Sequence, residues 1–247
     1  MDYTRYCALE FNGVVLDAAI DGYMTINVDG RGLLTREIKT VKVPGRAGDL
    51  IVDQSIPPRE LQVYFFLKAD RDIDFRKRLI YLHELLASDE DARIRFGDEI
   101  GSRFGRCTDI DDPPYDRNQG VGSFVLYCQD PFLYHEPKIL TGKKVILSPV
   151  SVYAHQLDQI TVNISSNRSG LFVRNLSTGQ RIILLGSFTA GDTVVMRPED
   201  GVLTVNGKSD LPRIDYVHSA WQDFKIYGEN RIDCPEEMVI QYREKRL

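Results

Sequence analysis

The sequence predicts a mainly β protein of the β-rich α+β class, built from two domains. Its 247 residues exceed what one hydrophobic core usually serves in a β-rich protein. One segment near residues 73–87 has the apolar spacing of a helix, whereas the second half consists of short alternating segments separated by Gly, Asn, Asp and Pro. We therefore expect a β-sandwich-like N-terminal domain with one α-helix over residues 1–137, and an antiparallel β-sandwich over residues 138–247.

An extended arm of about residues 30–58 is expected in the N-terminal domain. This stretch lacks sustained periodicity and contains the run Pro44-Gly45-Arg46-Ala47-Gly48. Long loops without secondary structure are uncommon in compact domains unless they bind something. One interpretation is an arm that contacts a partner, with Pro44, Gly45, Arg46 and Gly48 as candidate interface residues. The other interpretation is an ordinary hairpin with a glycine turn.

A helix is predicted over residues 73–87, because four apolar residues there fall on one face at spacings of four, three and four. Asp72 is the expected N-cap, and together with Asp74 it favours the positive end of the helix dipole. Strands are predicted around the helix at residues 61–67, 92–96 and 124–128 from their β-branched, aromatic or alternating character. The apolar stripe should pack on a sheet, and it consists of Phe75, Leu79, Leu82 and Leu86.

The second half contains several short strand signals and no helical period between them. Asn206-Gly207 follows one of these strands and readily supplies the positive backbone angles of a tight hairpin turn. This spacing favours an antiparallel sandwich. The predicted strands cover residues 160–164, 171–176, 180–185, 193–196, 202–205 and 238–242.

Charge and cysteine usage exclude several classes of protein. The formal net charge is -5, with acidic and basic residues interleaved, so no basic face is available to grip nucleic acid. The four cysteines lie far apart and read as reduced, mostly buried thiols. The first residues lack the pattern of a signal peptide, and the apolar runs are too short to cross a bilayer. We expect synthesis in a cytoplasm and no membrane insertion.

No motif in the sequence indicates an active site, a cofactor or a metal. The glycine-rich run at residues 44–48 lacks the spacing of a phosphate-binding loop. Asp109, Asp111 and Asp112 break the pattern of a calcium loop, and Pro113-Pro114 replaces its glycine turn. Of the four histidines, His83 is expected on the flank of the helix and the other three in loops. We therefore expect a protein that is not an enzyme and holds neither cofactor nor metal.

Trp221 is the only tryptophan, and it forms an aromatic group with Phe224 and Tyr227. Such rings can stack on a sugar if they are exposed. Packing in the core of the sandwich is the commoner explanation.

Several segments in this order resemble the distal tail protein family of phages with long, non-contractile tails. The run Pro44 to Gly48 resembles the family's Pro-Gly-Arg-x-Gly loop, and the ending Asp130-Pro131-Phe132-Leu133-Tyr134 is the most telling match. In the second half, Ile160 to Asn163 resembles the opening strand of the family's galectin-like domain. The turn Gly228 to Ile232 and the closing run Ile240 to Lys245 resemble its later parts.

This resemblance implies a structural hub of a phage tail tip or baseplate, with a galectin-like C-terminal sandwich and a terminal strand that can return to the first domain. The expected assembly is a homohexameric ring at the distal end of the tail tube, through which DNA passes. The implied partners are the tail tube protein, the tape-measure protein, the tail-associated lysin or tip protein, and receptor-binding proteins. The implied location is the tail tip of the virion of a phage or prophage. The alternative is a carbohydrate-binding β-sandwich for host adhesion, with Trp221 as the sugar contact.

Overall fold

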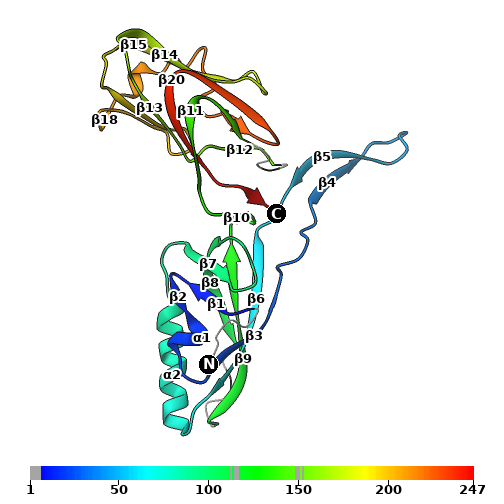
Figure 1. Ribbon diagram of the computed structural model, residues 1–247. Helices are drawn as coiled ribbons and strands as arrows, with labels where there is room; N and C mark the ends of the chain where they lie inside the picture. Colours follow the sequence, from blue (N-terminus) through cyan, green and yellow to red (C-terminus); the bar gives the residue numbers. More distant parts are fainter. Residues whose placement is uncertain (1–6, 112, 114–116, 148–150, 152) are drawn as a thin grey trace. The chain divides into compact units, whose positions relative to one another are not determined.

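The computed structural model describes residues 7–111, 113, 117–147, 151 and 153–247. The chain divides into two compact units, which consist of Met1–Leu133 with Leu247 and of Tyr134–Arg246. Strands make up most of the regular structure in both units (Figure 1), so the predicted mainly β class is confirmed. Each unit has its own buried apolar core.

The first unit is built on one curled antiparallel sheet of seven strands in the order β2-β1-β7-β8-β9-β6-β3. The long strand β6 has Leu61, Val63, Phe65 and Leu67 completely buried, while its intervening residues are half-buried or exposed. The strands are β1 (Leu9–Phe11), β2 (Val14–Val15), β3 (Tyr23–Asp29), β6 (Arg59–Lys68), β7 (Ala92–Phe96), β8 (Arg103–Asp111) and β9 (Gln119–Cys128), and the short helix α1 is Leu16–Ala19.

Helix α2 (Asp72–Leu86) covers this sheet with the predicted apolar stripe, whose four residues are all buried in the same core as the strands. The predicted N-cap was wrong by one residue. Arg71 is the N-cap because the helix already begins at Asp72, and it makes no side-chain cap bond because a guanidinium has no acceptor for a backbone N–H. The Asp72 carboxylate instead accepts the N–H of Ile73 at 2.8 Å, and Arg71 pairs with Asp74 at 2.7 Å.

The second unit is an antiparallel β structure whose main sheet has eight strands. The order is β15-β14-β20-β13-β16-β17-β18, and β11 also pairs with β20. These strands are β11 (Lys138–Leu147), β13 (Gln159–Asn163), β14 (Arg168–Asn175), β15 (Arg181–Phe188), β16 (Thr193–Arg197), β17 (Val202–Val205), β18 (Lys208–Ser209) and β20 (Asn230–Tyr242).

Short elements complete the second unit. They are β12 (His155–Gln156) with its partner β19 (Lys225–Ile226), β10 (Leu133–Tyr134) with its partner β21 (Lys245–Arg246), and the 3₁₀ helix η1 (Leu211–Arg213). His155 therefore lies in a strand and not in the predicted loop. The Asn206-Gly207 turn is confirmed, with φ of 52° and 77° at the two residues.

Candidate assembly interface

Residues 37–55 form a separate two-stranded antiparallel hairpin, which we call the arm ribbon. Strand β4 (Glu37–Lys42) pairs with β5 (Asp49–Ser55), with Glu37 opposite Ser55 and Lys42 opposite Asp49. Every residue of both strands is exposed. Figure 1 shows the ribbon extending beyond the end of β6 and away from the seven-stranded sheet. The arm expected from the sequence is thus an exposed hairpin.

The tip of the arm ribbon is the glycine-rich run at residues 44–48. The N–H of Arg46 donates to the carbonyl of Val43 at 3.2 Å, which closes a turn with Pro44 and Gly45 at its centre. Gly45 has a φ of 80°, and proline followed by a residue of positive φ is the pattern of a type II turn. Turn geometry explains Pro44 and Gly45, and it leaves Arg46 exposed at the tip.

The arm ribbon exposes large apolar side chains on both of its faces. By the strand register, Ile38 and Ile51 lie on one face while Val41 and Leu50 lie on the other. Exposed apolar patches of this kind mark interaction surfaces, and an isolated two-stranded hairpin is marginally stable in water. The ribbon is therefore suited to burial against another molecule. Its exposed large apolar residues are Ile38, Val41, Val43, Leu50, Ile51 and Val52.

The arm root, which we define as residues 30–32 and Arg59, joins the arm to the first unit. Arg59 is the first residue of β6 and is 1% exposed. Its Nη1 donates to the carbonyls of Gly30 and Gly32, the latter at 2.9 Å, and its Nε donates to the carbonyl of Pro131 at 3.1 Å. Burial lowers the pKa of Arg59, and the nearby positive charge of Arg103 lowers it further.

Arg31 fastens the same root to the end of β7 and to the loop that follows this strand. Its Nη1 lies 2.6 Å from Oδ1 of Asp98, and its guanidinium lies 5.0 Å from the centre of the Phe96 ring. The Arg31 side chain is about one-fifth exposed, so this ion pair is partly shielded from water. Gly30, Arg31 and Gly32 are thus held by contacts to two different parts of the first unit.

The first three residues of the family-like run, Asp130 to Phe132, lie at the arm root and not at the arm tip. Oδ1 of Asp130 accepts the N–H of Phe132 at 3.0 Å, a local turn that presents the Pro131 carbonyl to Arg59. The structure therefore brings Asp130, Pro131 and Phe132 to the base of the arm. The other motif of the sequence, Pro44 to Gly48, lies at its far end.

Tyr134 belongs to the second unit and lies beneath two cations. The Arg243 guanidinium is 5.1 Å and the Lys245 ammonium 5.2 Å from the centre of its ring. We expect Tyr134→Leu to lower the free energy of unfolding of the second unit by about 1 kcal/mol, because both cation–π contacts are lost while an apolar side chain remains. Urea unfolding followed by the fluorescence of Trp221 measures this loss. Tyr227→Leu at an exposed ring is the control, and an equal loss there would contradict the prediction.

Comparisons with known proteins match both units. Residues 21–126 match the phage tail protein RIFT-related domain, and residues 155–245 match the C-terminal domain of the siphovirus-type tail component. The distal tail protein of Bacillus phage SPP1 is 27% identical over 236 residues, which are 92% of each chain. This chain belongs to the siphophage distal tail protein family.

Two solved structures share the fold of this chain. The crystal structure of the SPP1 protein, described as a hub of the adsorption apparatus, has a TM-score of 0.85 at 20% identity and covers 98% of this chain and 100% of its own. A chain of the activated phage p2 baseplate with Sr has a TM-score of 0.50 at 8% identity, covering 89% of this chain and 90% of its own. Like its relatives, the chain is a component of the phage tail.

The matched regions locate the features described above within the distal tail protein family. The first region contains the arm ribbon and the whole arm root. The second contains most of the eight-stranded sheet. The run Asp130 to Tyr134 falls between the two matched regions, and its physical role at the arm root comes from the contact between Pro131 and Arg59.

The sugar contact considered for Trp221 requires an exposed ring, which the structure does not provide. Trp221 is 4% exposed and belongs to the core of the second unit, together with the fully buried Phe224. Only Tyr227 of this aromatic group is exposed. The ring of Trp221 is therefore a packing residue, as its commoner interpretation held, and it cannot stack on a glycan at the surface.

The described residues contain no group of three or more His, Cys, Asp or Glu side chains that could hold a metal ion. Burial raises the pKa of Cys107, Cys128 and Cys234 to about 11, which keeps these thiols protonated and poorly nucleophilic near neutral pH. His218 pairs with Asp215 at 2.8 Å in an exposed turn. None of the helices in the described part of the chain has the length and hydropathy of a membrane span.

Arg59 and Arg31 are the residues of the arm root that the sequence reasoning missed. Arginine is among the residues that are rarely buried, so the residue type gave no reason to expect Arg59 in a buried position. The available signal was the pair of glycines around Arg31. Gly30 has a φ of 87°, and a Cβ there would meet the Glu60 carbonyl oxygen at 2.0 Å. A glycine at this position marks a close approach between two backbone segments.

Proposed function

We propose that this chain is a structural hub subunit that assembles as a homohexameric ring at the distal end of the tail tube. In this role it connects the tube and the tape-measure protein to the tail-associated lysin or tip protein, and it can carry receptor-binding proteins outside. The chain performs no catalysis in this role. It is made in the cytoplasm of the bacterial host and functions in the virion.

The observation that supports this proposal best is the arm ribbon. It extends from a well-packed unit, it is exposed along both strands, and it carries apolar side chains on two faces. A subunit of a closed ring needs a surface that meets a different surface on its neighbour, and a projecting arm supplies such a surface. The candidate residues Pro44, Gly45, Arg46 and Gly48 form the tip that would reach the neighbour.

The charge of the chain fits a ring that lets DNA pass. Ring subunits that line a conduit must not bind the phosphate backbone, and binding it requires clustered Lys and Arg. The chain has 31 basic and 36 acidic residues, with a formal net charge of -5. The arm ribbon itself mixes both signs, since Lys39 and Lys42 lie opposite Asp53 and Asp49. Passage of DNA without sequence-specific binding is therefore part of the proposal.

Adhesion to host sugars by the second unit is not favoured. That alternative depended on an exposed aromatic group around Trp221, and two of its three rings are buried. A glycan array gives the direct check. We expect no saturable binding that is lost when Trp221 is replaced.

Light scattering coupled to size-exclusion chromatography tests the ring. We expect purified protein to reach the mass of six 28.2 kDa chains at high concentration, or when it is mixed with the tail tube protein. A ring that needs its partners should appear only in the mixture. A strict monomer in both conditions, over a wide range of concentrations, would refute the proposal.

A further inference from the structure

The arm root contains a buried charge that the first unit holds without a carboxylate: Nε and Nη1 of Arg59 donate hydrogen bonds, whereas the buried Nη2 has no hydrogen-bond partner. Among the ion pairs formed by the described residues, none includes Arg59, although this side chain is 1% exposed. A buried guanidinium without hydrogen bonds is costly, so its bonds to neighbouring groups determine where it can lie. Those bonds go to three backbone carbonyls, of Gly30, Gly32 and Pro131.

The three carbonyls belong to segments that are far apart in the sequence. Gly30 and Gly32 lie where the chain leaves the first unit toward the arm ribbon, and Arg59 lies where it returns. Pro131 belongs to the turn formed by Asp130 and Phe132. One side chain therefore ties the two ends of the arm to each other and to a third segment that is fixed by its own turn.

The outgoing end of the arm is confined by further contacts. The backbone of Gly30 passes so close to Glu60 that no Cβ fits between them. Arg31 is held by Asp98 and by the ring of Phe96. Beyond these contacts, at Leu33 and along both strands of the ribbon, the chain is exposed. The root is thus the part of the arm whose position the first unit determines.

We propose that Arg59 is a positioning residue that fixes the direction in which the arm ribbon leaves the first unit before any partner is bound. The benefit of this fixed direction for assembly rests on the proposed function, in which the arm contacts a neighbouring copy. An arm that is already oriented loses less conformational freedom on binding than one that must be ordered at the interface. Arg59 then acts on assembly through the arm and does not itself contact the partner.

Distances between spin labels measure the direction of the arm. One label is placed at the tip by Ala47→Cys and the other on the exposed side of α2 by Glu84→Cys, in a full-length chain in which Cys7→Ser and Cys107→Ser remove the two half-buried thiols. The labelled chain is diluted into excess unlabelled chain so that each assembly carries one labelled copy. We expect a narrow distance distribution when Arg59 is intact.

We expect Arg59→Met, which keeps an apolar stem but has no donor, to broaden this distribution by about twofold or more. Arg59→Lys retains the charge and fewer donors, so it should broaden the distribution less and provides a second variant if Arg59→Met fails to fold. Arg106→Met is the matched control, because Arg106 lies in β8 of the same unit and forms an exposed pair with Asp91. The helical circular dichroism signal verifies that each variant is folded.

The outcomes separate this proposal from the proposed function. A broader distribution with weaker ring formation supports both. A broader distribution with unchanged rings supports the role of Arg59 and contradicts the role of the arm in assembly. An unchanged distribution in folded Arg59→Met or Arg59→Lys overturns the proposal, whatever the rings do.

Discussion

Replacing residues 33–55 with a short Gly-Ser linker is expected to leave a folded chain that no longer forms rings. The core of the first unit contains no residue of the arm ribbon, so its packing should survive the deletion. The deletion removes the exposed apolar side chains of the ribbon. If three of them are buried at each contact between copies, at about 1.5 kcal/mol each, the loss is about 4–5 kcal/mol, or roughly a thousandfold in the dissociation constant.

Light scattering measures the mass of the truncated chain, and the helical circular dichroism signal of α2 verifies its fold. Single substitutions should reproduce part of the loss, with Val41→Ser and Leu50→Ser each weakening assembly by about tenfold. Ile80→Ser is the matched control, because Ile80 is an exposed apolar residue on α2 and lies outside the arm. Rings that persist in the truncated chain would show that the arm is not the contact between copies.

Elements with a regular local pattern were predictable from the sequence. The stripe of α2 was correct in all four residues, and the strand predicted at residues 92–96 has the bounds of β7. The predicted turn at Asn206-Gly207 was also correct, since these residues adopt positive φ readily. In the helix and the strand burial follows the period of the backbone, and in the turn the two residue types favour the backbone angles, so in each case neighbouring residues carry enough information.

The arm ribbon did not give this signal because both of its faces are exposed. Strands β4 and β5 have no buried face with which an apolar and polar alternation could correlate. The sequence therefore indicated an arm and its glycine-rich tip, while it left the two strands unassigned. Strand β11 was missed for a related reason, since most of its residues are exposed or half-buried and it contains two adjacent lysines, Lys143 and Lys144.

Buried charges were unpredictable because their partners are distant in the sequence. Arg59 donates hydrogen bonds to carbonyls 27 to 72 positions away. Only the last five residues of β20 were predicted as a strand. The residues just before them, Pro235, Glu236 and Glu237, are of types that are uncommon inside a strand. In the structure Glu236 points into the second unit and is 1% exposed. Its partners, Ser165 and Arg168, lie far from it in the sequence; Ser165 is 71 positions away.

Glu236→Gln is expected to lower the free energy of unfolding of the second unit by about 2–3 kcal/mol at pH 7. Oε2 of Glu236 accepts from the backbone N–H of Ser165 at 3.2 Å and from its hydroxyl at 2.6 Å, and the other oxygen pairs with the Arg168 guanidinium. Removing one charge of a buried pair leaves the other poorly compensated. Arg168 is about one-fifth exposed, so the loss should fall below that of a fully buried pair.

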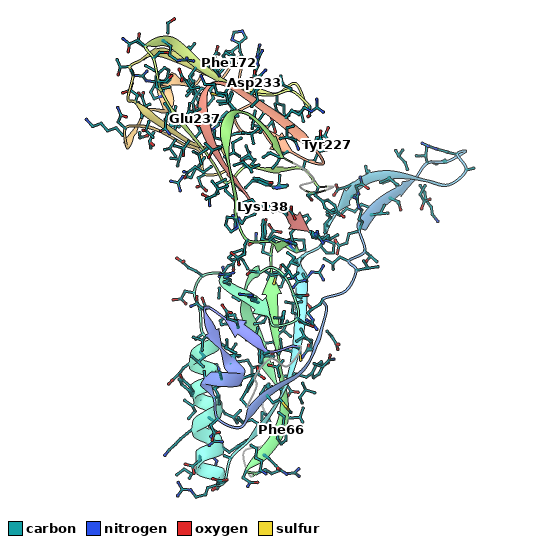
Figure 2. All side chains as sticks on the ribbon, viewed as in Figure 1. Phe66, Lys138, Phe172, Tyr227, Asp233 and Glu237 are labelled. Carbon is teal, nitrogen blue, oxygen red and sulfur yellow. The ribbon has the colours of Figure 1, made fainter. Side chains whose placement is uncertain are left out.

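Urea unfolding followed by tryptophan fluorescence isolates this effect, because Trp221 is the only tryptophan and lies in the core of the second unit. Glu237→Gln is the matched control. Glu237 is the next residue of β20, has the same side chain and is exposed; it is labelled in Figure 2. Its replacement should change the free energy of unfolding by less than about 0.5 kcal/mol.

The contribution of Glu236 should also depend on pH in a defined direction. Burial alone would raise the pKa of this carboxyl, but the hydrogen bonds from Ser165 and the charge of Arg168 outweigh burial and lower it below its ordinary value. A depressed pKa means that the ionised form stabilises the fold. The stabilisation is complete above the ordinary glutamate pKa of about 4.3, and it is lost as the pH falls through the lower pKa of the folded state.

The native chain and Glu236→Gln should therefore differ in their free energy of unfolding by a constant amount from pH 7 to about pH 5, and this difference should disappear below about pH 4. A difference that widens as the pH falls would show that burial dominates and that Glu236 is held in its neutral form.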